Sequence, residues 1–223
     1  MSRMMARRIL AIDAGILNLG WAVAEYTTHR VSDLHVVAYG NEDVTPACRV
    51  EGCSLPHSRE LWDRLHHTHA HVLRDYAEEA DAVLLERQPP GGLGEVTAFF
   101  YSMYRDKATY IHPRSMHTHY GMGHLGYDDR KRHMLGVARQ WVPHLDCGVD
   151  RRTHDVADAL GMMGFWLHRQ QNPVVPGRQR TTGRPTPRCT LVSPAVSPPV
   201  SPPHWMDRFK CVIDDPKKKD VQL

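Results

Sequence analysis

The chain has 223 residues and is 41% hydrophobic, which is enough for one folded domain of ordinary size with an additional segment. No apolar run approaches the ~20 residues that cross a membrane, and the basic first ten residues lack the apolar segment of a secretory signal. Five cysteines without the spacing of a disulfide scaffold suit a reducing compartment. We therefore expect an intracellular protein that is neither secreted nor inserted in a membrane.

The net charge of +3 is unevenly distributed along the chain. Residues 171–223 contain nine Lys or Arg and four Asp or Glu, a net charge of +5, so the first 170 residues carry a net charge of −2. Ten of the sixteen prolines also fall in the last stretch, where they restrict φ and remove backbone donors. We expect a folded domain over 1–170 and a disordered, proline-rich tail with a basic end over 171–223. Binding to nucleic acid would have to rest on local basic patches.

The hydrophobic pattern predicts an α/β domain. In chain order, the predicted elements are strands over 8–13, 19–26 and 34–39, a helix over 58–80, a strand over 82–86, a helix over 94–107, a strand over 108–111, and helices over 129–142 and 153–168. Short, turn-rich joins connect the first three strands, which suits an antiparallel meander. The later alternation of strand and helix predicts a mixed five-stranded sheet with helices on both faces.

Four carboxylates lie where a sheet-based nuclease would hold metal ions. Asp13 and Glu86 end two apolar strands, and Asp155 and Asp158 share a face of the last predicted helix because they are three residues apart. Each, taken singly, can be accounted for by turn chemistry or by the helix dipole. Together they favour a catalytic centre that binds Mg²⁺, which prefers oxygen ligands, with two ions present and Mn²⁺ able to substitute. His154 is a further catalytic candidate, either as a metal ligand or to position or protonate a phosphate oxygen.

Basic residues provide candidate phosphate contacts. Arg130, Lys131 and Arg132 are adjacent, and Arg139 follows two turns further along the same predicted helix. Such runs are often solvated surface charge, but a position beside a metal centre favours contact with DNA phosphates. Further candidates that would extend this DNA-binding patch are Arg87, Arg114, Arg151 and Arg152.

Four segments carry a resemblance to a known family. They are Ile12-Asp13-Ala14-Gly15 with Gly20 five residues further on, Leu85-Glu86-Arg87-Gln88-Pro89, His112-Pro113 followed by Gly121, Gly123 and Lys131, and His154-Asp155-Val156-Ala157-Asp158-Ala159-Leu160. Together they resemble the acidic motifs and basic helix of RuvC-type Holliday junction resolvases of the RNase H-like superfamily. The resemblance is nearest to the branch of poxviruses, other large DNA viruses and yeast mitochondria, and it spans Ile9 to Leu167.

This resemblance implies an RNase H-like fold and a homodimer that binds four-way DNA junctions in recombination or replication. The implied activity is that of a crossover junction endodeoxyribonuclease, which makes paired, magnesium-dependent nicks near the crossover. Asp13, Glu86, Asp155 and Asp158 would be the metal ligands, and Lys131 would lie near the scissile phosphate. The viral branch of the family would put such a protein in the cytoplasm of an infected host cell.

Other functions remain open at this point. A transposase-like recombinase or a general RNase H-type nuclease would use the same catalytic core. The sequence shows no large accessory DNA-binding or integration domain, which argues against the transposase. A sugar-kinase or actin-like phosphotransferase also starts with a strand followed by Asp-x-Gly, but it needs two related domains and a longer chain. Four retained carboxylates disfavour a catalytically silent adaptor.

A cysteine and histidine pattern has no counterpart in that family. Cys48, Cys53 and His57 precede the predicted helix over 58–80, in which His67 and His71 are spaced i, i+4. Thiolate and imidazole ligands suit tetrahedral zinc, and a loop plus a helix can supply four. The pattern predicts either a structural Zn²⁺ bound by Cys48, Cys53 and His57 with an ambiguous fourth ligand, or free cysteines beside a polar histidine face.

Overall fold

The computed structural model describes residues 6–89, 92–146 and 152–173. The predicted tail from residue 174 onward and Arg151 lie outside the described residues. Within the described ranges no helix combines the length and the apolar character needed to cross a membrane.

The domain is built on a five-stranded mixed sheet. The strands are β1 (Arg7–Asp13), β2 (Leu19–Tyr26), β3 (His35–Glu42), β4 (Ala82–Glu86) and β5 (Ala108–Ile111). Their order in the sheet is β3-β2-β1-β4-β5. The first three strands pair antiparallel, as the short joins between them predict, whereas β4 pairs parallel with both β1 and β5. The predicted mixed sheet is therefore confirmed.

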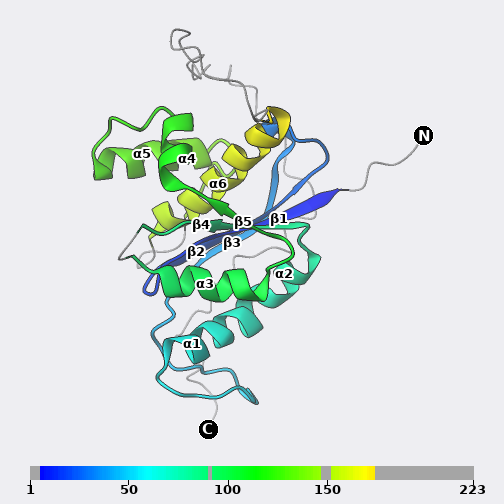
Figure 1. Cartoon of the computed structure of the whole chain (residues 1–223), viewed down its shortest axis with the longest axis vertical. Helices are drawn as coiled ribbons and strands as arrows, with labels where there is room; N and C mark the ends of the chain where they lie inside the picture. The colour runs from blue at the N-terminus through cyan, green and yellow to red at the C-terminus, as the bar shows by residue number, and fades with distance from the viewer. Residues whose placement is uncertain (1–5, 90–91, 147–151, 174–223) are drawn as a thin grey trace, which may run out of the picture. The chain divides into compact units, whose positions relative to one another are not determined.

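Helices cover both faces of this sheet. They are α1 (Leu61–Thr68), the π-helical turn η2 (His69–Leu73), α2 (Arg74–Glu79), α3 (Gly94–Met103), α4 (Pro113–His119), α5 (Tyr127–Ala138) and α6 (Thr153–Gln171), with a short 3-10 turn η1 (Val31–Asp33). Figure 1 shows α4, α5 and α6 on one side of the sheet and α1, α2 and α3 on the other. Each layer encloses its own hydrophobic core with one face of the sheet.

Two helices depart most from the sequence prediction, while α3 ends four residues before its predicted end and α5 begins two residues and ends four residues earlier than predicted. The helix predicted over 58–80 begins only at Leu61 and is interrupted by the π turn, in which His69 Nδ1 lies 2.7 Å from the hydroxyl of Tyr104. Helix α4 was not predicted, because its polar and histidine-rich sequence has no apolar periodicity and buries only Met116. It begins at Pro113, which suits the first helical position because proline lacks the backbone N–H.

Side-chain alternation along the strands decides which face carries the acidic residues. In β1, Ile9 and Ala11 enter the core beneath α6, whereas Leu10 and Ile12 enter the core of the opposite face. Because successive strand side chains point to opposite faces, Asp13 continues the first series and points toward the α6 layer. Glu86 follows Leu84 in the same way on β4.

Candidate active site

Three of the predicted metal ligands converge at one end of the sheet. One carboxylate oxygen from each of Asp13, at the end of β1, and Asp155 and Asp158, in the first two turns of α6, lies within 4.8 Å of the other two. All three residues are at least nine-tenths buried. The strand end and the helix therefore place three acidic side chains in one low-dielectric cluster, which is costly unless cations share it.

Glycine at position 20 permits this convergence. Gly20 lies opposite Asp13 in the β1–β2 pair. A Cβ built on Gly20 would lie 2.5 Å from the carbonyl carbon and oxygen of Asp155, so any side chain would collide with the first turn of α6. The absence of a side chain on β2 thus lets α6 approach the sheet closely enough for its carboxylates to reach Asp13.

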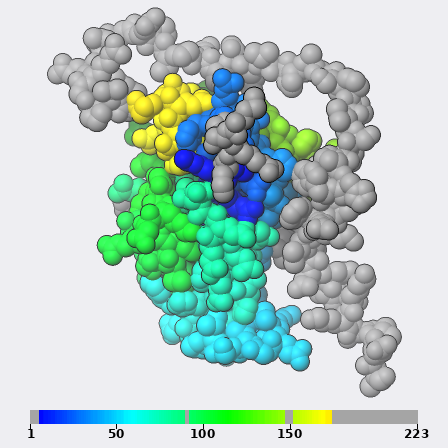
Figure 2. All heavy atoms as spheres, turned by 90° about the vertical axis from the view of Figure 1, so that its right-hand side faces the viewer, coloured from blue at the N-terminus to red at the C-terminus, as the bar shows by residue number. Residues whose placement is uncertain are grey.

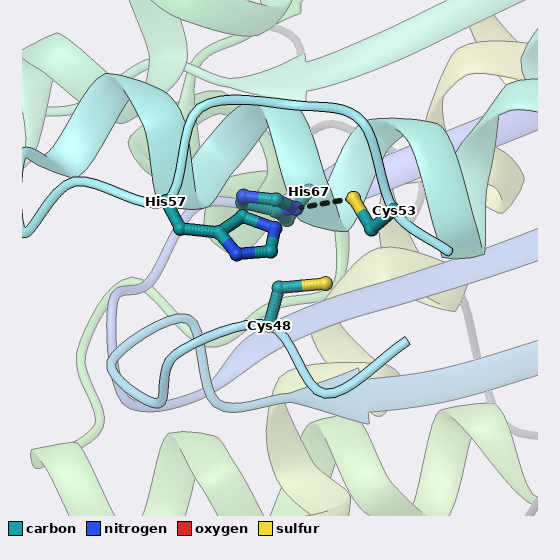
Figure 3. Close-up of side chains that lie close together, drawn as sticks. All are labelled: Cys48, Cys53, His57 and His67. Atoms are coloured by element: carbon teal, nitrogen blue, oxygen red, sulfur yellow. Dashed lines mark hydrogen bonds between the residues drawn. The ribbon is translucent and has the colours of Figure 1, made fainter. Parts of the chain in front are cut away.

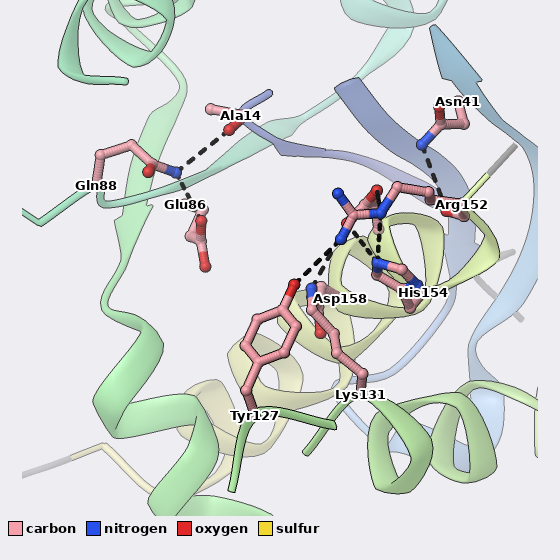
Figure 4. A network of polar contacts seen from close by, with 10 residues as sticks. Ala14, Asn41, Glu86, Gln88, Tyr127, Lys131, Arg152, His154 and Asp158 are labelled. Atoms are coloured by element: carbon pink, nitrogen blue, oxygen red, sulfur yellow. Dashed lines mark hydrogen bonds and ion pairs between the residues drawn. The ribbon is translucent and has the colours of Figure 1, made fainter. Parts of the chain in front are cut away.

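Glu86 lies beside Asp13 but outside the group of three. The register of the parallel pair aligns Ile12 with Leu85, so Asp13 and Glu86 occupy the next positions on neighbouring strands. Gln88 Nε2 donates a hydrogen bond of 2.6 Å to Glu86 Oε2 and a longer one of 3.4 Å to the carbonyl oxygen of Ala14. Gln88 therefore ties the second acidic strand end to the first (Figure 4).

The pKa values record how the carboxylates crowd one another. Burial raises the pKa of Asp13 well above its usual value, and the negative charges of Glu86 and Asp158 raise it further. Burial also raises the pKa of Glu86, and it raises the pKa of Asp158 even though Lys131 opposes the shift. The protein without metal therefore resists full ionisation of this cluster, and a divalent cation would offset both the burial and the repulsion between the carboxylates.

Among the described residues, the half-buried Lys131 is the cation closest to the acidic cluster. Its Nζ hydrogen-bonds to Asp158 Oδ2 and lies 3.5 Å from Asp155 Oδ1. Although burial lowers the pKa of Lys131, the charge and hydrogen bond of Asp158 outweigh it and raise the pKa, so the ammonium stays charged. Close packing of α5 against α6 places Lys131 beside Asp158. One turn further along, a Cβ on Gly161 would lie only 2.5 Å from Met134 Sδ, so the glycine permits this close approach of the two helices.

His154 and Arg152 form the exposed rim of the cluster. Arg152 Nε donates to His154 Nε2 at 2.8 Å, and Arg152 Nη2 donates to the hydroxyl of Tyr127 at 3.1 Å (Figure 4). Burial lowers the pKa of His154. Because Nε2 accepts a hydrogen bond from a guanidinium, it carries no proton in this arrangement. The geometry therefore favours a positioning role for His154 over proton donation.

The other candidate arginines take different positions. Arg130 donates to the carbonyl oxygen of Leu125 at 2.7 Å and so supports the loop before α5, and Arg132 pairs with Asp129 at 2.5 Å on the surface. The remaining described candidates are exposed: Arg87, Arg114 and Arg139. Of the described arginines that were predicted to bind DNA, Arg152 is the one within contact distance of a predicted catalytic carboxylate, with Nε 3.7 Å from Asp155 Oδ2.

The prediction from sequence missed supporting residues around the site. Tyr127 contacts Arg152, and its ring lies 5.6 Å from Lys131 Nζ. Asn41, which is 2% exposed, donates to the carbonyl oxygen of Arg152 at 3.4 Å. A single polar side chain on a strand or at the start of a helix does not reveal from the sequence which distant residue it will contact. Gln88 lies within the motif around Glu86, but the sequence did not show that its side chain would hydrogen-bond to the Glu86 carboxylate.

These residues fit a divalent metal ion. Asp155 Oδ2 is buried and accepts no hydrogen bond from any described residue, because Arg152 Nε at 3.7 Å is beyond hydrogen-bond distance. This oxygen therefore has a lone pair that a metal ion would satisfy. Ligand atoms that are all oxygen suit a hard cation such as Mg²⁺ better than a soft one. The donor set, its burial and the orphaned oxygen all agree with the predicted metal centre.

Comparison with known proteins supports the architecture. No protein-family model and no curated protein sequence matches the chain. Among solved structures, the yeast mitochondrial Holliday junction resolvase Ydc2 matches with a TM-score of 0.52 and 13% identity, over 74% of this chain and 81% of that one. The Holliday junction resolvase of fowlpox virus matches with a TM-score of 0.50 and 15% identity, over 72% and 98% of the two chains. The chain therefore has the RNase H-like fold that its sequence predicted.

Proposed function

We propose that this protein is a structure-selective endonuclease that resolves four-way DNA junctions by paired, metal-dependent phosphodiester nicks. The observation that carries the proposal is the cluster of Asp13, Asp155 and Asp158 with Lys131 bound to it, at the end of the central strand of the sheet. The fold that the chain shares with two Holliday junction resolvases supports a junction as the substrate.

The chemistry follows from the donor set. Divalent ions held by these carboxylates, which we expect to be two Mg²⁺ with Mn²⁺ able to substitute, would activate water and stabilise the leaving oxygen. Asp13, Asp155 and Asp158 supply the ligand oxygens, with Glu86 beside them and oriented by Gln88. Lys131 remains charged and is positioned to stabilise negative charge that develops on the phosphate.

The surface around the site supplies contacts for the substrate backbone. Arg152 lies at its rim, and exposed arginines on neighbouring elements can bind further phosphates without reading sequence. Paired nicks in opposite strands of one junction need two catalytic centres, so the proposed functional unit is a homodimer. A viral origin, with action in the cytoplasm of an infected cell, would fit the sequence resemblance to the poxvirus branch.

The test is cleavage of a synthetic four-way junction beside matched duplex DNA and an RNA–DNA hybrid, each with Mg²⁺ and with chelator. We expect symmetric nicks near the crossover of the junction that disappear with the chelator. The double variant Asp155→Asn/Asp158→Asn controls for contaminating nucleases, because it removes two ligands and should be inactive.

Two outcomes would redirect the proposal. Cleavage of the hybrid or of plain duplex at a rate equal to that of the junction would keep the catalytic centre but make the protein a general RNase H-type nuclease. Tight junction binding without cleavage at any Mg²⁺ or Mn²⁺ concentration would overturn the assignment as an enzyme and favour an adaptor.

A further inference from the structure

The long loop between β3 and α1 has almost no buried apolar side chains to hold it in place. Residues 43–60 contain neither helix nor strand, and after Val44 none of them is buried. Loops of this length without secondary structure are uncommon in compact domains. In Figure 2 the cyan atoms of this region lie on the surface at the bottom of the view, so apolar packing alone does not hold the loop.

Two cysteines and two histidines gather where this loop meets α1. Cys48, Cys53 and His57 come from the loop and His67 comes from α1, and their ligand atoms all lie within 4.8 Å of one another (Figure 3). Cys48 and Cys53 are half-buried within an exposed loop, and both are free thiols. The loop therefore turns its two sulfur atoms toward the helix.

The spacing of these atoms matches one metal ion. Cys53 Sγ lies 3.4 Å from His67 Nδ1. Tetrahedral zinc with Zn–S of ~2.3 Å and Zn–N of ~2.0–2.1 Å places a sulfur and a nitrogen ligand ~3.5 Å apart. We propose that Cys48, Cys53, His57 and His67 bind a structural Zn²⁺ that fastens the loop to α1. Thiolate ligands favour zinc over the hard cation of the catalytic carboxylates.

A hydrogen bond prepares His67 for this role. His67 Nε2 lies 2.9 Å from the carbonyl oxygen of Pro56. A carbonyl only accepts, so Nε2 carries the proton and Nδ1 presents its lone pair toward Cys53. Ligating histidines commonly donate the second ring N–H to a carbonyl or carboxylate in this way, which fixes the tautomer and the ring orientation.

His67 is the proposed fourth ligand, a position that the sequence left ambiguous. His71 lies outside the group of four, although its Nε2 is 3.1 Å from Cys53 Sγ. An N–H donated from His71 to the Cys53 thiolate would support the ligand from outside the tetrahedron. The start of the loop is already fixed to the β1–β2 turn by a hydrogen bond of 2.8 Å from Val44 N to the carbonyl oxygen of Ile16. We therefore expect zinc to order the rest of the loop, beyond Val44.

The test measures zinc bound to the purified full-length protein. Protein is dialysed against Mg²⁺ without chelator, and zinc per chain is determined by mass spectrometry, for wild type and for Cys48→Ser and His67→Gln. His66→Gln is the matched control, because His66 is adjacent on α1 but packs its ring 4.8 Å from Phe99. We expect about one zinc per chain in wild type and His66→Gln, and less than about a tenth of that in the other two.

Two further measurements distinguish zinc at this site from metal bound at the acidic cluster and from loss of folding in a variant. Asp13→Asn should keep its zinc, because its carboxylate belongs to the other cluster. Cobalt substituted into wild type should show thiolate-to-metal charge transfer, a readout that does not depend on a variant folding. Zinc-free wild type that is fully folded, zinc retained by Cys48→Ser, or a Cys48–Cys53 disulfide in the purified protein would each overturn the proposal.

Discussion

Replacing Gly20 by alanine should damage catalysis more than stability. The added Cβ would lie 2.5 Å from the carbonyl group of Asp155, and ordinary contact begins near 3.4 Å, so the start of α6 must move by the difference, about 0.9 Å. The clash is with backbone, which cannot rotate away as a side chain can. A shift of ~1 Å at reacting groups can cost ~100-fold in rate, whereas overpacking typically costs about 1–3 kcal/mol in the free energy of unfolding.

The assay compares initial rates of junction cleavage and thermal unfolding for Gly20→Ala and a matched control. Gly136→Ala is that control, because Gly136 lies on the exposed side of α5 and a Cβ there meets nothing within 4 Å. It should retain the wild-type rate and gain about 0.5–1 kcal/mol of stability, because alanine favours helix. Wild-type cleavage by Gly20→Ala would refute the argument that this glycine sets the distance between α6 and β1.

Other changes at the site have distinct expected results. Asp13→Asn should abolish cleavage yet keep junction affinity in a gel-shift assay, and equal loss of both would contradict a role limited to metal binding. Lys131→Met should lower the cleavage rate by about 100–1,000-fold with little change in junction affinity, and an unchanged rate would exclude a transition-state role. Gly161→Ala should lower the rate less than Gly20→Ala does, because the atoms that its Cβ would meet are the flexible ends of Met134 and Met116. Unfolding of this variant at room temperature would show that the α5–α6 contact cannot adjust in this way. Burial raises the pKa of Asp13 in the folded protein above its value in the unfolded chain, so the metal-free folded state binds the Asp13 proton more tightly. The stability that this proton contributes is fully present below about pH 4, the unfolded pKa. It is lost as the pH rises through the folded pKa, so the melting temperature of wild type relative to Asp13→Asn should fall with pH, and saturating Mg²⁺ should suppress the fall.

Local sequence pattern was sufficient for the sheet and for most of the site's candidates. Strand β2 and strands β4 and β5 have the predicted bounds, because apolar runs between turn residues define strands without help from distant contacts. Asp13 and Glu86 were recognisable because a charge that ends an apolar strand is unusual. The helix over 58–80 was predicted as continuous because its apolar period persists. The π turn contains a contact between His69 and the distant Tyr104 that no local pattern records.

The amino-acid sequence by itself determined which residues could serve: acidic side chains at strand ends, a basic helix, and two cysteines beside histidines. Only the tertiary structure decided how they combine. It brought Lys131 onto Asp158 and left one oxygen of Asp155 without a hydrogen-bond donor among the described residues. It also placed both His67 and His71 beside Cys53, with His67 in the group of four that includes Cys48 and His57. The physical reason is that strand and helix periods are properties of adjacent residues, whereas these distances depend on how closely separate elements pack, and that is set by contacts such as the one at Gly20.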